Sequence, residues 1–166
     1  MTLGMSLETF TIVHVVISLI GILSGFVVVF GLVGGKPLDG WTALFLSTTV
    51  LTSVTGFMFP FEKVTPGIKV GIISLVVLAI AIAARYAFHL AGAWRVIYAV
   101  GAILALYLNV FVLVAQSFEK VPALHALAPT GSEPAFFVVQ LVVLAAFLAL
   151  GSLATIRFRR AAVHAT

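Results

Sequence analysis

The chain has 166 residues, of which 63% are hydrophobic and only 8% are charged. An ordinary soluble domain has roughly 45–50% apolar and 25% charged residues, so this composition excludes a water-exposed globular surface and predicts a bundle surrounded by lipid. Nine Lys and Arg against five Asp and Glu are too few basic residues to predict nucleic-acid binding. The absence of cysteine excludes disulfides, thiolate catalysis and cysteine-bound metal.

Five apolar stretches are each about long enough to cross a bilayer, since a spanning helix needs roughly 20 residues. We therefore predict one all-α integral membrane domain over residues 1–166, without a soluble domain. In chain order the predicted spans are residues 10–34, 41–60, 70–89, 94–118 and 136–156, and residues 119–135 form an external loop. The prolines and the glycine of that loop favour turns over a helix.

The basic residues predict which end of the bundle faces the cytoplasm, because Lys and Arg concentrate on the cytoplasmic side of membrane proteins. One predicted side carries Lys36, Arg85, Arg95, Arg157, Arg159 and Arg160. The other carries Lys63, Lys69 and Lys120. With five spans, this asymmetry places the N-terminus outside and the C-terminus inside. Trp41 and Trp94 then fall at the inner interface, where Trp anchors helices, and Arg85 is expected to extend to the headgroups.

Polar and small side chains within the spans mark the faces that pack against other helices. In the first span, Gly21 and Gly25 form a GxxxG pair that can serve a helix of the same chain or a second protomer. The polar residues from mid-membrane to the outer leaflet predict an outward-facing binding pocket: His14, Thr52, Thr55, Asn109, Gln116 and Gln140. Hydrogen bonds that merely join helices are the alternative. Asn109 stands out, since an amide at mid-span has four hydrogen-bonding sites to satisfy.

His14 also admits a cofactor role, because a histidine near the outer boundary can bind haem or hydrogen-bond to a quinone. Electron-transfer haem usually needs a second axial ligand, and Met58 and His125 lie on the same predicted side, whereas His89 lies on the opposite one. The candidate cofactor-binding residues are therefore His14, Met58 and His125. A histidine with a purely structural role is the alternative, and the cofactor itself stays unidentified at this point.

The run from Ala105 to Val112, with Gln116 and the stretch from Leu127 to Pro134, resembles a pattern of small bacterial multi-spanning inner-membrane proteins of uncharacterised function. The resemblance covers about the last third of the span region. It implies a location in the bacterial inner membrane and draws attention to Asn109, Gln116 and Glu133. It implies no reaction, ligand or partner.

These observations favour a binding protein over an enzyme, because no set of residues predicts a reaction. We expect the outward-facing pocket to bind a small hydrophobic or amphipathic molecule, or a partner subunit. A haem- or quinone-associated redox protein is one alternative, with His14 as ligand or donor. A small-solute transporter or channel is another, with hydroxyls of the second span along the path. Expected partners are membrane lipids and either another subunit or a second copy of the chain.

Overall fold

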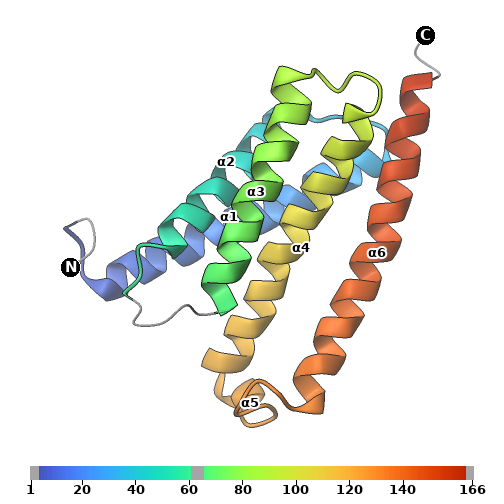
Figure 1. Cartoon of the computed structure of the whole chain (residues 1–166). Helices are drawn as coiled ribbons and strands as arrows, with labels where there is room; N and C mark the ends of the chain where they lie inside the picture. The colour runs from blue at the N-terminus through green and yellow to red at the C-terminus, as the bar shows by residue number, and fades with distance from the viewer. Residues whose placement is uncertain (1–3, 61–65, 164–166) are drawn as a thin grey trace.

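The computed structural model describes residues 4–60 and 66–163, and helices make up 82% of the structure (Figure 1). Lys63, which contributes to the predicted orientation, lies outside these ranges. In chain order the elements are α1 Leu7–Val33, α2 Asp39–Gly56, α3 Pro66–Ile82, the π-helical turn η1 Ala83–Ala87, α4 Trp94–Lys120, α5 Pro122–His125 and α6 Pro134–Val163. The all-helical class agrees with the sequence prediction.

Four of these segments are long and apolar enough to cross a membrane: α1, α3 together with η1, α4, and α6. At 1.5 Å per residue, the 27 residues of α1 and of α4 extend about 40 Å, which matches a bilayer with its headgroups. The 18 residues of α2 extend only about 27 Å, and hydroxyl side chains lower its hydropathy. The chain therefore has four candidate membrane-spanning helices, while a fifth span remains a prediction.

The helix ends differ from the predicted spans in both directions: α2 ends at Gly56, before the predicted residue 60, whereas α6 runs to Val163, beyond the predicted residue 156. α4 continues to Lys120, and the short helix α5 occupies part of the segment predicted as a loop without helix. Pro122 is the first residue of α5, and its fixed φ and missing N–H suit a helix start. Pro66 and Pro134 begin α3 and α6 in the same way. Proline in this chain thus starts helices as often as it interrupts them.

The helices are arranged around α4. α1 and α2 form one antiparallel pair, α4 and α6 form another, and α3 packs against both α2 and α4 (Figure 1). α4 contacts α1, α3 and α6 and touches α2. The two pairs lie close together at the upper end of Figure 1 and diverge toward the lower end, and the termini lie at opposite ends of the bundle.

Small residues permit the close approach of these helices. A Cβ added at Gly25 would lie 2.7 Å from Leu106 Cδ1 and 2.8 Å from Phe45 Cε2, so α1 contacts α4 and α2 at this point. A Cβ added at Gly101 would lie 3.1 Å from Ala81 Cβ, where α4 meets α3. The GxxxG pair of the first helix is therefore buried against helices of its own chain.

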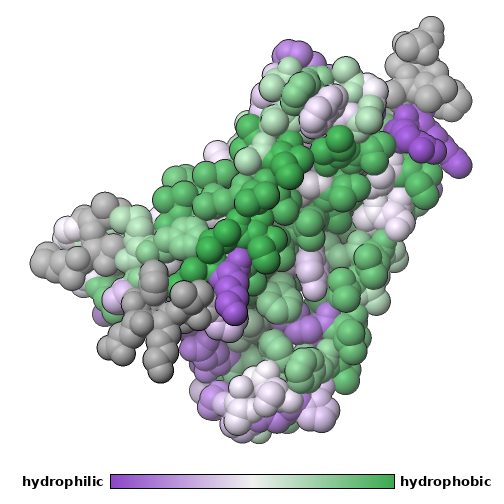
Figure 2. Space-filling model, viewed as in Figure 1, coloured by the Kyte–Doolittle hydropathy of each residue, from purple (hydrophilic) through white to green (hydrophobic). Residues whose placement is uncertain are grey.

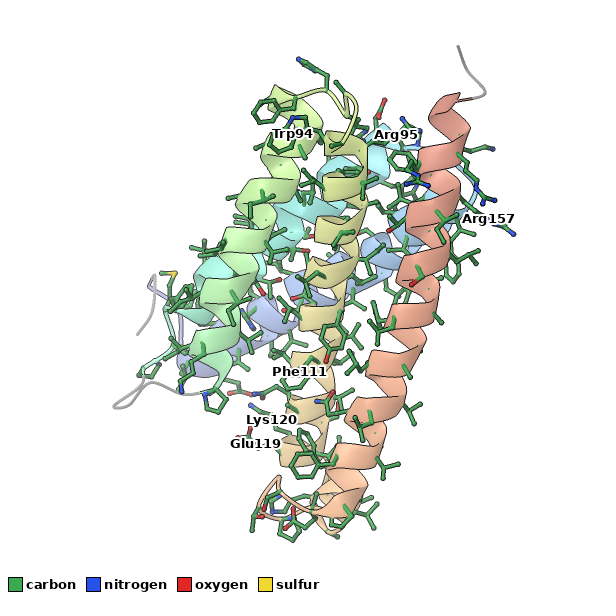
Figure 3. The ribbon with its side chains drawn as sticks, turned by 45° about the vertical axis from the view of Figure 1, so that its right-hand side comes forward. Trp94, Arg95, Phe111, Glu119, Lys120 and Arg157 are labelled. Atoms are coloured by element: carbon green, nitrogen blue, oxygen red, sulfur yellow. The ribbon has the colours of Figure 1, made fainter. Side chains whose placement is uncertain are left out.

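The outer surface of the bundle is apolar, and its polar residues gather near the two ends. Large aliphatic side chains point outward, among them Leu23, Leu141 and Val142, each more than 60% exposed. Figure 2 shows hydrophobic residues across the middle of one face. Figure 3 places Arg95 and Arg157 at the upper end, and Glu119 and Lys120 at the lower end. Such a surface suits lipid, because acyl chains offer polar groups no hydrogen bonds.

Candidate functional site

A histidine–threonine contact joins α1 to α2 near the lower end of the pair. His14 Nδ1 lies 2.7 Å from Thr55 Oγ1. The imidazole also meets the ring of Phe59 edge-on, with 5.1 Å between centroids and an interplanar angle of 85°, and Phe59 in turn packs on Phe10. Both His14 and Thr55 are half-buried. Two of the predicted site residues are thus brought into direct contact and are flanked by aromatic rings.

Further along the same pair, polar atoms from two helices, α2 and α4, converge on Gly21 of α1. An added Cβ at Gly21 would lie 3.2 Å from Thr48 Oγ1, 3.3 Å from Thr49 Oγ1 and 3.7 Å from Asn109 Nδ2. Asn109 of α4 donates a hydrogen bond of 3.4 Å to Thr49 Oγ1 of α2. The absence of a side chain at Gly21 leaves α1 room beside these groups. We call the following set the polar seam: His14, Gly21, Thr48, Thr49, Thr52, Thr55 and Asn109.

Two of the four threonine hydroxyls of the polar seam donate their proton within their own helix. Thr48 Oγ1 donates to the Leu44 carbonyl at 2.7 Å, and Thr55 Oγ1 donates to the Leu51 carbonyl at 2.7 Å. Their oxygens therefore remain able to accept a hydrogen bond from another helix or from a ligand. Thr52 Oγ1 is buried and has no hydrogen-bond partner among the described residues. The polar seam consequently offers more acceptors than donors.

The two predicted glutamines lie outside the polar seam. Gln116 is an exposed residue of α4. Gln140 of α6 donates a hydrogen bond of 3.1 Å to the Phe111 carbonyl of α4, while its own Oε1 is buried without a partner in the described part of the chain. The structure therefore brings His14, Thr52, Thr55 and Asn109 along one side of α2, and it uses Gln140 to tie α6 to α4.

The candidate cofactor residues are dispersed. Met58 follows the end of α2 and is half-buried, whereas His125 is an exposed residue of α5. α5 packs against α4 and makes no contact with α1 or α2, so His125 is not brought next to His14. Within residues 4–60 and 66–163, no three His, Asp or Glu side chains gather to hold a metal ion.

Two apolar grooves lie away from the polar seam, and both border α3. One, of about 470 Å³, runs between α2 and α3 and is lined by residues that include Val50, Ile82 and Tyr86. The other, of about 300 Å³, lies between α3 and α4 and is lined by residues that include Val77 and Val100. Neither groove is lined by a predicted site residue, and such shallow apolar hollows are suited to acyl chains.

A second polar cluster, which the sequence did not predict, lies at the opposite end of the bundle. Arg85 forms an ion pair with Asp39, and its guanidinium carbon lies 5.2 Å from the ring centroid of Tyr98. Tyr98 is fully buried, and its hydroxyl lies 3.0 Å from Thr42 Oγ1. Thr42 Oγ1 in turn donates to the Pro37 carbonyl at 2.9 Å. This cluster fastens α2 to η1 and α4.

The position of Arg85 corrects the expectation that it extends to the headgroups. Its side chain is only 7% exposed and points to Asp39 and Tyr98. Arg85 lies in η1, and a π-helical turn has more residues per turn than an α-helix, which changes the face that a side chain occupies. Asp39 could have indicated this ion pair from the sequence, because it is the one acidic residue on the predicted inner side.

Arg95 fastens α4 to α6 at the same end. Its Nε donates a hydrogen bond of 2.7 Å to the Phe158 carbonyl, and its guanidinium carbon lies 3.8 Å from the centroid of the Phe158 ring. Phe158 is fully buried. Arg95 therefore combines a charge-assisted hydrogen bond with a cation–π contact. Arg157, Arg159 and Arg160 remain exposed on α6.

Glu133 organises the turn that precedes α6. Its carboxylate accepts hydrogen bonds from the Thr130 N–H at 3.0 Å, the Thr130 hydroxyl at 2.9 Å and the Ser132 N–H at 3.0 Å. The bond from the Thr130 N–H, together with the others, lowers the pKa of Glu133 from its ordinary value. These contacts give Glu133 a local structural role at the start of α6.

A search of protein-family models, curated proteins and solved structures found no match to this chain. The resemblance of residues 105–134 to small bacterial inner-membrane proteins therefore remains an expectation from the sequence. The function has to be argued from the chemistry of its own side chains, and the polar seam is where the predicted site residues meet.

Proposed function

We propose that this chain is a five-helix protein of the bacterial inner membrane that binds a small amphipathic molecule at the polar seam. In the proposed orientation the N-terminus is outside and the C-terminus is inside, so that His14 lies toward the outer leaflet. α2 is the fifth span, because it runs antiparallel to α1 along most of the length of that helix (Figure 1). The ligand would place its polar group at the seam and its apolar part among the outward-facing aliphatic side chains.

The observation that carries this proposal is the unused hydrogen-bonding capacity of Asn109. An amide has two donor hydrogens and two acceptor lone pairs. Within the described residues, the Asn109 side chain makes one hydrogen bond, and its length of 3.4 Å is well above the usual 2.9–3.0 Å. Asn109 is also half-buried, and its Oδ1, which has no partner among the described residues, is not a fully buried atom.

The contact that joins α2 to α4 at the other end of the bundle is shorter than the bond of Asn109. There Tyr98 and Thr42 are 3.0 Å apart, and both are fully buried. Asn109 instead leaves its carbonyl oxygen and one N–H for a further partner, in a region where lipid chains supply none. Thr52, one turn from Thr49 on α2, adds a buried hydroxyl without a partner among the described residues. A ligand with its own polar group would satisfy Asn109.

The test is native mass spectrometry of the protein released from lipid nanodiscs, on the unmodified chain and on Asn109→Leu. Leu has the same branching as Asn and the same number of side-chain heavy atoms, but no hydrogen-bonding group. We expect the unmodified protein to retain a bound mass other than phospholipid, and Asn109→Leu to retain about tenfold less, the ratio for roughly 1.4 kcal/mol of lost binding free energy. Ser117→Ala is the matched control, since Ser117 of α4 bonds to its own helix at Leu113.

Two results would contradict the proposed function. One is an unmodified protein that carries only phospholipid at every collision energy. The other is equal retention by the unmodified protein and by Asn109→Leu, because the ligand would then lie elsewhere. A bound mass of protein size would identify a partner subunit in place of a small molecule. Thermal unfolding of both variants in detergent checks that Asn109→Leu remains folded.

A further inference from the structure

The contact between His14 and Thr55 fixes which ring nitrogen of His14 carries a proton. A hydroxyl has one hydrogen to donate. Thr55 Oγ1 lies 2.7 Å from the Leu51 carbonyl oxygen, and two oxygens approach this closely only when a proton lies between them. The Thr55 proton is therefore used within α2. The 2.7 Å contact with His14 must then be a hydrogen bond that Nδ1–H donates to Thr55 Oγ1.

This assignment leaves Nε2 as the atom that can meet a ligand. No carboxylate pairs with His14 in the described part of the chain, so an imidazolium would have no counter-ion there. In the neutral ring with a proton on Nδ1, Nε2 is an acceptor only. Nε2 has no hydrogen-bond partner among the described residues and is not among the buried atoms, so it is accessible from outside.

The depth of His14 limits what can reach this acceptor. His14 lies seven residues after Leu7, where α1 begins, which is about 10 Å along the helix. In the orientation proposed above, this is just inside the hydrocarbon, since each headgroup region is about 5–8 Å thick. Acyl chains offer no donor, and ester carbonyls and phosphates are acceptors like Nε2 itself. Water and the donor headgroups of phospholipids favour the polar layer outside this depth, so we look for the donor in an amphipathic molecule that places its polar group at His14.

We propose that the ligand of the polar seam is a hydroxyl-headed amphiphile whose O–H group donates to Nε2 of His14. This inference rests on the proposed function and adds the chemical class of the ligand. A long-chain alcohol and a hydroquinone both provide such a hydroxyl. A quinone or an ether, which only accepts, has no favourable contact with Nε2.

The first measurement is the ¹⁵N NMR spectrum of the histidine rings of the full chain in nanodiscs. Protonated and unprotonated ring nitrogens have well-separated shifts, and the His14→Gln variant identifies the signals of His14 among the four histidines. We expect a protonated Nδ1 and an unprotonated Nε2. A proton on Nε2, either in the other tautomer or in an imidazolium, overturns the inference.

The second measurement titrates two matched pairs of probes into the same sample. One pair is dodecanol and dodecyl methyl ether, and the other is decylubiquinol and decylubiquinone. Within each pair, the two probes are compared by the mole fraction in the lipid at which the Nε2 signal shifts. The probe with a hydroxyl should shift the signal at a mole fraction about tenfold lower than the probe without one. The pair with the lower half-saturation identifies the source as an aliphatic alcohol or a hydroquinone.

The Thr55→Val variant tests the link between tautomer and selectivity. Valine removes the acceptor that orients the ring, so His14 can place its proton on Nε2. The two probes of each pair should then bind with about equal affinity. Ser47→Ala is the control, because Ser47 is also a hydroxyl of α2 that bonds to its own helix but is exposed. It should keep the full preference.

The outcomes separate this inference from the proposed function. Equal affinity within both pairs, or no shift with any of the four probes, overturns the hydroxyl-headed ligand. The bound mass retained in native spectra, and its dependence on Asn109, decides the proposed function independently. A protein that retains such a mass but shows no hydroxyl preference would bind an amphiphile of another class.

Discussion

Gly25 shows how a single missing side chain sets the spacing of three helices. A Cβ at this position would lie 2.7 Å from Leu106 and 2.8 Å from Phe45, and both of those side chains are almost fully buried. Because neither can move aside freely, we expect Gly25→Ala to lower the free energy of unfolding by about 1–3 kcal/mol. Reversible unfolding in mixed micelles measures this change.

Gly40 provides the matched comparison for Gly25. It lies at the start of α2, is exposed, and has nothing within 4 Å of an added Cβ. Gly40→Ala should therefore raise the free energy of unfolding by about 0.4–1 kcal/mol, since alanine reduces the freedom of the unfolded chain. If Gly25→Ala proved as harmless as Gly40→Ala, α1 would not be held against α2 and α4 as described.

Glu133 gives a prediction for pH at the residue scale. Its pKa is lowered chiefly by the hydrogen bond from the Thr130 N–H. The ordering of the turn is therefore fully present above the pKa of a free glutamate and is lost as the pH falls through the lower pKa of the folded protein. The amide signals of Thr130 and Ser132 should titrate together below the ordinary range of glutamate.

The Glu133→Gln variant is the control for this titration. Glutamine has no proton to gain at low pH, so the amide signals of Thr130 and Ser132 should no longer respond. A midpoint at or above the value of a free glutamate in the unmodified chain would show that the carboxylate does not hold the turn.

At the scale of elements, hydrophobicity was sufficient to locate the long helices but not their ends. Length and apolar content identified four segments that the structure also has as candidate spans. The helix boundaries depend on local chemistry, such as Pro122 at the start of α5 or Ser6, whose hydroxyl accepts from the Thr9 N–H at the start of α1. The short helix α5 was missed because Pro122 was interpreted as part of a turn-rich loop.

The candidate site could be predicted in part. Depth within the membrane follows from sequence position, and it correctly grouped His14 with Thr55 and Asn109 with the threonines of α2. Depth does not tell which way a side chain points around its helix. For this reason the sequence could not show that Gln116, although predicted at a suitable depth, is exposed and lies outside the polar seam. Arg85 was misplaced because a π-helical turn leaves no pattern in hydrophobicity.

At the scale of the whole molecule, the position of α2 decides the number of spans. The absence of native cysteine makes single-cysteine labelling unambiguous. Lys36 and Pro60 are exposed residues before and after α2. If α2 spans, a membrane-impermeant maleimide added to intact spheroplasts should label Pro60→Cys and leave Lys36→Cys unmodified until the membrane is permeabilised.

Cysteines at the ends of the last helix calibrate this experiment. Ser132→Cys should label from outside and Arg159→Cys only from inside, because α6 is a candidate span in its own right. Labelling of Lys36→Cys and Pro60→Cys from the same side would limit the chain to four spans and place its termini on the same side of the membrane.

The hydrogen bonds between the helices are unevenly distributed along the bundle. At one end, Tyr98 of α4 meets Thr42 of α2 across the two helix pairs, and the ion pair of Arg85 with Asp39 ties η1 to α2. Farther along, the bond from Asn109 to Thr49 also crosses between the pairs but is longer, at 3.4 Å, and the bonds of His14 and Gln140 each remain within one pair. In the orientation proposed above, the two pairs are therefore joined more firmly toward the inner leaflet than toward the outer one. An amphiphile that binds the polar seam as proposed would then enter sideways from the outer leaflet, without passing across the membrane.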